Sequence, residues 1–296
     1  MTNAGEFEEF ESHRRRLFGL AYRMLGSAWE AEDAVQDAYL RWSAADRTEI
    51  ERPGAWLAKV VTHLCLTRLT SARARREQYV GPWLPEPVLT SDGTLGPLES
   101  AEQREAVSLA LLTLLERLTP TERAVYVLRE AFAYGHREIA RVLDIGEANS
   151  RQIYRRAVAR LAVPESRFEP APEQRRGLVE SFITAARDGD VTGLEKLLAS
   201  DVTWWGDGGG KVSAARRPVE GREKVVRFLT GAVERWTAGL ELSVIEVNGT
   251  PGMLIMSGET VFAVAAFEFR DGLIVAVRGV LNPDKLGYAG RQLAAG

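Results

Sequence analysis

The chain has 296 residues, a formal net charge of −3 and a single cysteine, Cys65. This length is enough for two or three domains of ordinary size, and one cysteine excludes an intramolecular disulfide. No apolar run approaches the ~20 residues that cross a bilayer, and the acidic N-terminus is unlike a signal peptide. We expect a cytoplasmic globular protein without a membrane partner, in which Cys65 is a buried structural thiol.

The small net charge conceals two basic segments. Residues 59–76 contain five basic side chains and no acidic one, and residues 148–161 contain four basic side chains, again without an acid. Contacts to phosphates contribute much of the affinity of proteins for nucleic acids. Local clusters of Lys and Arg therefore indicate nucleic-acid binding even when the whole chain is close to neutral.

The N-terminal part is predicted to be helical. Apolar residues between 7 and 77 recur three or four positions apart, which places them on one face of a helix. Gly26 and Ser27 interrupt this pattern before a second helix over 28–42. A third helix is expected over 54–76, following a proline at a position that a helix start tolerates.

The segment that follows, 78–100, is too rich in proline and glycine to be a continuous helix. Residues 79–87 read YVGPWLPEP, where the prolines favour an extended backbone and Tyr79, Trp83 and Leu84 supply apolar side chains. A passive spacer does not need such side chains. We interpret the segment as a docking strip, either for an edge of the C-terminal part of the chain or for a channel on a partner. Local packing on a neighbouring helix is the alternative.

A helix-turn-helix is predicted within 119–161. Thr119, Pro120 and Glu122 are typical of a helix start, and the later helices HREIARVL and ANSRQIYRRAVARL are joined by the short turn DIGE. The last helix of such a motif enters the major groove. Its inner side is expected to carry Ile153, Tyr154, Ala157 and Leu161, and its outer side the candidate DNA contacts Asn149, Arg151, Gln152, Arg155 and Arg156. A solvated basic face is the alternative.

Three segments resemble parts of a bacterial sigma factor of the extracytoplasmic-function group, and they follow one another along the chain in the order typical of that group. Residues 119–161 resemble the domain that reads the minus-35 promoter element. Residues 31–42, AEDAVQDAYLRW, resemble the helix that docks on RNA polymerase, and 52–77 resemble the segment that melts and reads the minus-10 element. This resemblance implies two partners, core RNA polymerase and promoter DNA, and a function in promoter-specific initiation.

The resemblance also assigns residues. The carboxylates that would meet a basic polymerase surface are Glu30, Glu32, Asp33 and Asp37; a merely solvated acidic face is the alternative. The minus-10 contacts would be one aromatic and five basic side chains, Trp56, Lys59, Arg68, Arg73, Arg75 and Arg76. Trp56 could instead belong to the core. Members of this group often carry Asp at the position of Thr67, so detailed promoter preference is not transferred.

After a boundary at 164–172, the part 173–296 is predicted to be α+β, with helices first and an antiparallel sheet after them. Helices are expected over 173–187, 190–199 and 222–236. Four apolar runs then read as strands, separated by turns at Asn248-Gly249 with Pro251-Gly252, and at Asp271-Gly272. Asn-Gly and Asp-Gly between such runs are strong hairpin signals.

This third part resembles the SnoaL-like fold, a cone of curved sheet with helices across its mouth, and sigma factors with such a tail form a subgroup. Three short motifs carry the likeness: WLPEP, DGGGK and NPDKL. With Tyr79, they supply the expected regulatory contacts, namely Trp83, Leu84, Pro85, Glu86, Pro87, Asp207, Gly208, Gly209, Gly210, Lys211, Asn282, Pro283, Asp284, Lys285 and Leu286. The glycines suggest a flexible lip or a turn that needs positive φ.

Catalysis by the third part is the weaker hypothesis. The histidines, His13, His63 and His136, all precede residue 164, so acid–base chemistry would fall to Asp207, Lys211, Asp284 or another carboxylate, and a metal would need an all-oxygen site. We therefore expect no enzyme activity, metal or cofactor. A DNA-binding regulator fused to a SnoaL-like enzyme or small-molecule sensor remains an alternative, since such cones are concave and apolar.

Taken together, the sequence predicts a multidomain sigma factor whose tail regulates it in cis by intramolecular contact with the linker or the sigma domains. The expected divisions are a region 2 domain (1–77), a Pro-rich linker (78–100), a region 4 helix-turn-helix domain (101–163), a second linker (164–172) and a SnoaL-like domain (173–296). The two sigma domains are expected to be all-α.

Overall fold

The structure is a computed structural model that describes residues 3–90, 95, 106–161, 171–236 and 239–295. The chain forms two compact units. The first comprises Met1–Glu77, Gly93–Val107 and Leu111–Val163, and the second comprises Gln78–Asp92, Ser108–Ala110 and Pro164–Gly296. Residues 78–92, which the sequence suggests to be part of a linker, thus group with the C-terminal part of the chain.

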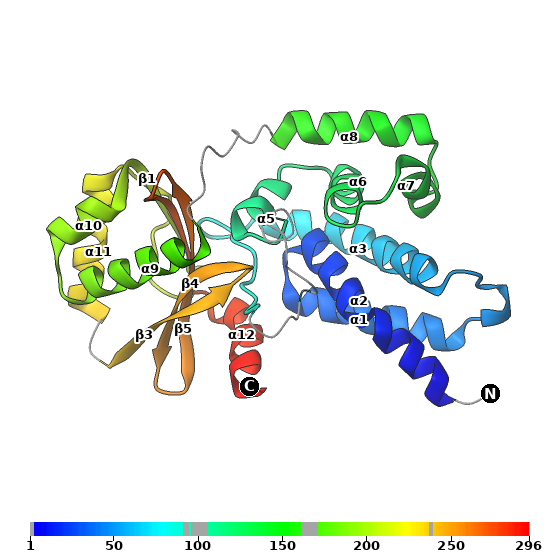
Figure 1. Cartoon of the computed structure of the whole chain (residues 1–296), viewed down its shortest axis with the longest axis horizontal. Helices are drawn as coiled ribbons and strands as arrows, with labels where there is room; N and C mark the ends of the chain where they lie inside the picture. The colour runs from blue at the N-terminus through cyan, green and yellow to red at the C-terminus, as the bar shows by residue number, and fades with distance from the viewer. Residues whose placement is uncertain (1–2, 91–94, 96–105, 162–170, 237–238, 296) are drawn as a thin grey trace. The chain divides into compact units, whose positions relative to one another are not determined.

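The first unit is helical, as predicted. It begins with α1 (Asn3–Leu25), α2 (Ala28–Ala44), a 3₁₀ turn at Arg47–Glu49 and α3 (Pro53–Glu77) (Figure 1). Gly26 takes a positive φ of 67° after α1, and the side chain of Ser27 caps α2 by accepting a hydrogen bond from the Glu30 amide at 3.1 Å. Cys65 is buried, as expected, and burial raises the pKa of its thiol to about 12.

The rest of this unit contains most of α5 (Leu109–Leu115) and the whole of α6 (Pro120–Glu130), α7 (His136–Leu143) and α8 (Glu147–Leu161). These helices confirm the predicted helix-turn-helix. A capping box starts α6, because Thr119 and Glu122 each bond the other's backbone amide, at 3.3 and 3.0 Å. Asp144 ends α7 in the left-handed conformation, with φ 55°. The predicted helical stretch 101–105 lies outside the described residues.

The second unit has helices α9 (Pro172–Arg187), α10 (Val191–Leu197), α11 (Arg222–Trp236) and α12 (Pro283–Ala295). Its strands are β1 (Leu198–Asp207), β2 (Val219–Glu220), β3 (Leu240–Val247), β4 (Thr250–Ser257), β5 (Thr260–Arg270) and β6 (Leu273–Val280). They form one sheet in the order β2-β1-β6-β5-β4-β3. The pairs from β3 to β6 are antiparallel as predicted, whereas β1 and β6 are parallel, so the sheet is mixed.

Two further expectations need correction. Pro251-Gly252 is not a turn, because β4 already begins at Thr250. Pro251 pairs with Glu246 of β3, whereas the pairing of β4 with β5 begins only at Gly252. The missing N–H of Pro251 therefore interrupts no hydrogen-bond ladder on the β5 side. The chain also ends in a helix, α12, where the prediction ended in strands. The Asn-Gly and Asp-Gly turns are confirmed, with positive φ at Asn248, Gly249, Asp271 and Gly272.

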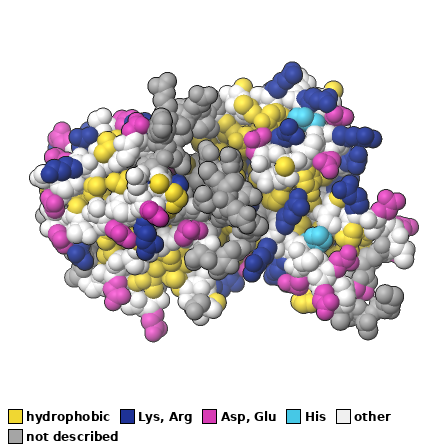
Figure 2. Space-filling model, in the orientation of Figure 1, with side chains coloured by type: hydrophobic (Ala, Val, Ile, Leu, Met, Phe, Trp, Pro, Cys, Tyr) yellow, Lys and Arg dark blue, Asp and Glu magenta, His cyan; other side chains and the backbone are white. Residues whose placement is uncertain are grey.

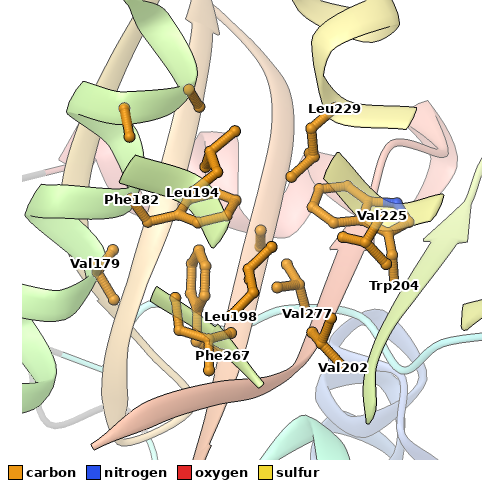
Figure 3. Close-up of a cluster of buried hydrophobic side chains, with 14 of the residues drawn as sticks. Val179, Phe182, Leu194, Leu198, Val202, Trp204, Val225, Leu229, Phe267 and Val277 are labelled. Carbon is orange, nitrogen blue, oxygen red and sulfur yellow. The ribbon is translucent and has the colours of Figure 1, made fainter. Parts of the chain in front are cut away.

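Each face of the sheet has its own core. On one face, α9, α10 and α11 bury a cluster that includes Phe182, Leu194, Trp204, Val225 and Phe267, whose side chains point toward one another between the helices and the sheet (Figure 3). On the other face, α12 packs with residues 84–89. Leu84 and Leu89 share that second cluster with Leu286 and Ala289 of α12 and with strand residues such as Val264.

Candidate functional site

Helix α8 presents a polar outer side, as the sequence predicts. Asn149, Arg151, Gln152, Arg155 and Arg156 are all exposed, and Lys and Arg side chains recur over the surface that α7 and α8 form (Figure 2). The opposite side of α8 is fixed to the unit, with Ile153, Ala157 and Leu161 buried. Tyr154 is half-buried, and its hydroxyl donates to Glu130 at 2.7 Å. The helix thus combines an anchored side with a cationic one.

The exposed cations of α8 are not equivalent. Glu122 of α6 has a nearly buried carboxylate that accepts from Arg160 at 2.6 Å and lies 3.7 Å from Arg156. Arg151 pairs with Glu147 within the same helix at 2.5 Å. Arg155 makes no ion pair within the described part of the chain. It is therefore the cation of the predicted set that is most available for a phosphate or a base edge.

The predicted minus-10 residues separate into different environments. Arg68 holds α3 to α2, donating to the carbonyl oxygen of Glu30 and to Asp37 Oδ2, each at 2.7 Å. Arg76 donates to the carbonyl oxygen of Leu25 at 2.7 Å and pairs with Glu116. These contacts give both arginines a structural role, and they join Arg68 to Asp37, one of the carboxylates assigned to polymerase. The side chains of Arg73 and Arg75 lie outside the described residues.

Trp56 and Lys59 both lie near the start of α3. The Trp56 ring is half-buried and lies 5.8 Å from the Trp42 ring, at an angle of 56°, so it fills part of the core edge while keeping one side accessible. Lys59 Nζ lies 2.6 Å from Asp144 Oδ1, and this contact lowers the pKa of the Asp144 carboxyl. Thr67 is exposed, and its hydroxyl donates to the carbonyl oxygen of His63.

The acidic residues assigned to polymerase lie along α2. Asp33 is exposed, and Glu30, Glu32 and Asp37 are partly buried. The same helix exposes two large apolar side chains, Trp29 at 38% and Leu40 at 58%. Sequence reasoning on charge alone missed both. Exposed large apolar side chains on a helix that also carries carboxylates are typical of a protein-binding surface, where apolar anchors contribute affinity and charges contribute specificity.

A buried charged cluster joins the helices of the first unit. Glu116 accepts from both Arg76 and Arg123, and the Arg123 side chain, 2% exposed, also donates to the carbonyl oxygen of Arg23 at 3.2 Å. Burial lowers the pKa of Arg23 to about 10. The sequence contained no signal for this cluster, because Arg23 and Arg76 lie far along the chain from Glu116 and Arg123.

In the second unit, residues 79–90, here called the strap, dock on the C-terminal fold through Asp207. The Asp207 side chain is 0% exposed. Its Oδ1 accepts from the Tyr79 hydroxyl at 2.5 Å, and its Oδ2 accepts from the Leu84 amide at 2.8 Å and from Lys285 Nζ at 2.7 Å. Lys285 also donates to the carbonyl oxygen of Leu84 at 2.6 Å. We call Tyr79, Leu84, Asp207, Asn282 and Lys285 the clasp.

Aromatic rings complete the clasp. Lys285 Nζ lies 4.6 Å from the centroid of the Tyr79 ring and 4.2 Å from that of Trp83, both within the range of cation–π attraction. Asn282 Nδ2 donates to the Tyr79 oxygen at 2.8 Å. Burial and the neighbouring Asp207 carboxylate raise the pKa of Tyr79 well above its usual range. The phenol therefore stays protonated and keeps donating to Asp207.

The remainder of the strap adds backbone pairing. Leu89 forms an antiparallel bridge with Val247 of β3, and Val88 exchanges hydrogen bonds with Asn248 at 2.9 and 3.0 Å. Gln292 of α12 bonds both the amide and the carbonyl of Leu89. The strap is thus held at the sheet edge by a single β-bridge and by side-chain bonds from Asn248 and Gln292 to its backbone. Pro85, Glu86 and Pro87 are buried along its course.

The DGGGK and NPDKL motifs meet at this site. Gly209 takes φ 58°, and a Cβ there would lie 2.3 Å from Asn282 Nδ2, so the turn needs glycine for both its conformation and its close approach. Gly210 also has a positive φ, and Gly208 is buried. Lys211 and Asp284 form an exposed ion pair at 2.6 Å. Pro283 starts α12, and Leu286 is buried in the core beneath the strap.

Comparison with known proteins identifies the class to which these units belong. Residues 10–75 match the family Sigma-70 region 2, and residues 108–161 match Sigma-70, region 4. The sequence is 39% identical over 292 residues to the ECF RNA polymerase sigma factor SigJ of Mycobacterium tuberculosis, covering 95% of this chain and 93% of that protein. It is 30% identical to the probable ECF sigma factor SigI of the same species, covering 97% of each chain.

The crystal structure of M. tuberculosis SigJ has the same fold, with a TM-score of 0.76, 36% identity, and coverage of 95% of this chain and 98% of that one. The chain therefore belongs to the ECF RNA polymerase sigma factors, and its function is promoter-specific transcription initiation. The structural match includes the C-terminal unit, so the α+β tail is shared with SigJ. Among the described residues, no helix is long and apolar enough to span a membrane.

Proposed function

We propose that this sigma factor acts in the cytoplasm, binds core RNA polymerase through α2, and contacts promoter DNA with α3 at minus-10 and with α8 at minus-35. We further propose that its C-terminal unit regulates these activities in cis by holding the strap. The observation that carries the second proposal is the buried Lys285–Asp207 pair, which bonds both the carbonyl and the amide of Leu84. A passive linker would not need its backbone fixed in this way.

Chain connectivity explains how the strap could act on the sigma regions. Helix α3 ends at Glu77 and α5 begins at Leu109, so the strap occupies the first part of the connection between the two. When residues 79–90 are held by the C-terminal unit, only 91–108 remain to span the rest of that connection. A shorter tether restricts the relative arrangements of the two regions. It therefore changes the effective concentration at which the second region meets DNA once the first region has bound.

The proposal requires two states. In the docked state the strap buries Leu84 and Leu89 in the C-terminal core; in the released state those side chains and the backbone of the strap become available to a channel on polymerase. A ligand or partner shifts such an equilibrium only by binding the two states unequally. Polymerase binding that uses the strap would therefore compete with the clasp, and this competition is the regulation that we propose.

We assign no catalytic role to the C-terminal unit. Asp207 accepts from Tyr79, Leu84 and Lys285, and Lys211 pairs with Asp284. The three acid–base candidates named from the sequence are thus engaged with one another or with the strap and its lysine. A sigma factor with a regulatory tail accounts for these contacts without a reaction.

Truncation after residue 163 tests the cis-regulation. In a purified transcription system, the truncated and full-length proteins should differ in transcript yield or in affinity for core polymerase. Trp83→Ala in the full-length chain should reproduce the effect of truncation, because Trp83 covers Lys285 in the clasp. Equal polymerase affinity and equal yield for all three proteins would contradict the proposal. A gel-shift assay with and without core enzyme separates a sigma factor from a regulator that binds its site alone.

A further inference from the structure

The C-terminal unit contains a cavity that the clasp does not use. Its volume is about 320 Å³, and it opens between the sheet and the helices α9 and α11. Phe182 and Trp204, which Figure 3 shows between these elements, form part of its wall with Phe228, Leu242, Met253 and Ile255. The Trp204 and Phe228 rings lie 5.6 Å apart. This is an aromatic and aliphatic wall of the kind that small-molecule sites have.

The polar groups at this cavity are few. Among the described residues that line it, Ser213 and Arg227 have the only polar side chains apart from the Trp204 indole N–H. Arg227 is paired with Glu223 at 2.6 Å, and both side chains are largely exposed. The lining that the structure describes includes no His, Cys, Tyr, Asp or Glu. A charged ligand would lose its hydration without a buried partner, so the wall favours an uncharged apolar molecule.

We propose that this cavity is a binding site for an uncharged, predominantly apolar molecule of about two fused or linked rings. The size follows from the volume, because an apolar cavity of about 150 Å³ takes up benzene, and this one is about twice as large. The aromatic rings at Phe182, Trp204 and Phe228 favour a flat ligand that packs against their faces and edges. The lining supports binding rather than chemistry on the ligand.

The position of the cavity relates it to the clasp. Gly206 of β1 lines the cavity, and the next residue, Asp207, holds the strap. Ser213 and Ala215, which follow the DGGGK turn, line the cavity as well. The same strand end and loop thus contribute to both sites. The binding proposed here does not depend on cis-regulation by the strap, and either proposal can fail while the other stands.

The test is a fluorescence titration of the full-length protein with N-phenyl-1-naphthylamine, an uncharged fluorophore that brightens in apolar surroundings. The wild type should bind it saturably with one site per chain, and naphthalene should displace it. Leu242→Trp fills the cavity from β3 and should weaken binding at least about tenfold, or ~1.4 kcal/mol. Ser243→Trp is the matched control, because Ser243 is exposed on the other face of the same strand; it should leave the affinity within about twofold.

Thermal unfolding of each variant checks that the fold is retained. If Leu242→Trp does not fold, Ala186→Leu replaces it, because Ala186 lines the same cavity from α9; the same loss of affinity is then expected. Absence of saturable binding to the wild type, or equal affinity in the cavity variant and the Ser243→Trp control, would overturn the proposal. Neither result would affect the transcription assays of the clasp.

Discussion

Lys285 and Asp207 form a buried ion pair where the strap docks on the C-terminal fold. The Lys285 Nζ lies 2.7 Å from the Asp207 Oδ2, and the two side chains are 8% and 0% exposed. Desolvation makes such a pair expensive, and the cost is offset only when further hydrogen bonds satisfy both partners. Here the amide and carbonyl of Leu84 and the hydroxyl of Tyr79 provide those bonds. The stability of the pair therefore depends on the strap being docked, and the docking of the strap depends on the pair.

Replacing Lys285 with Met should open the clasp. The substitution keeps most of the apolar stem but leaves the Asp207 carboxylate buried without its cation, which typically costs about 3–5 kcal/mol. We expect a lower unfolding free energy for the C-terminal unit in denaturant titrations, together with faster limited proteolysis within the strap. Lys211→Met is the matched control: Lys211 pairs with Asp284 at the surface, where ion pairs contribute little, and both measurements should stay at the wild-type value.

Tyr79→Phe removes a single oxygen from the clasp. That oxygen donates to Asp207 at 2.5 Å and accepts from Asn282 at 2.8 Å, while the ring remains beside Lys285. Because the lost bond is to a carboxylate but Tyr79 is only partly buried, we expect a loss of about 1–2 kcal/mol of unfolding free energy. Chemical denaturation would show it as a smaller effect than that of Lys285→Met. An equal or larger effect would mean that the hydroxyl, and not the cation, dominates the docking.

Two arginines of α8 should give opposite readouts. Arg155 makes no ion pair among the described residues, so Arg155→Ala should weaken promoter binding by the holoenzyme about 10–100-fold and leave the melting temperature unchanged. Arg160 pairs with the nearly buried Glu122, so the main effect of Arg160→Ala should be a lower melting temperature. Promoter binding measured alongside thermal unfolding separates the two. Unchanged promoter affinity in Arg155→Ala would remove that residue from the DNA surface.

The helix-turn-helix should lose stability in mildly acidic solution. Burial lowers the pKa of His136 below 6.5, with Arg129 and Arg151 adding to the shift. The folded state therefore favours the neutral ring, so the unfolding free energy is at its full value above pH ~6.5 and falls as the pH drops below it, where the unfolded chain binds the extra proton. An NMR titration of the His136 ring measures the pKa directly. Arg151→Gln should raise it toward 6.5; a wild-type pKa at or above 6.5 would contradict the burial argument.

Local signals in the sequence were sufficient for much of the fold. Thr119 and Glu122 marked the start of α6 because a capping box is a short-range pattern, and Asn248-Gly249 marked a hairpin because the turn itself requires those residues. The parallel pairing of β1 with β6 was missed because a pairing between strands so far apart along the chain leaves no local pattern. The final helix was missed although Asn282 and Pro283 are ordinary residues for a helix start.

For the candidate sites, too, local patterns were predictable from the sequence and long-range contacts were not. The outer side of α8 followed from helical periodicity, but charge alone placed Arg68 on DNA and Asp37 on polymerase, while the structure pairs them at 2.7 Å. The strap was recognised from apolar residues among prolines, yet the burial of Lys285 had no sequence signal, since lysine is rarely buried without a partner. Its partner, Asp207, is 78 positions earlier in the chain, and only the fold brings them together.

Run-off transcription with purified core polymerase and one cognate promoter tests the central claim, that the docked strap controls this sigma factor. Full-length wild type, Lys285→Met and Lys211→Met should be compared at matched concentration and below their melting temperatures. We predict that Lys285→Met shifts transcript yield in the same direction as truncation after residue 163, and that Lys211→Met gives the wild-type yield. The same yield from wild type and Lys285→Met, with proteolysis showing that the strap is released in the variant, would contradict the account.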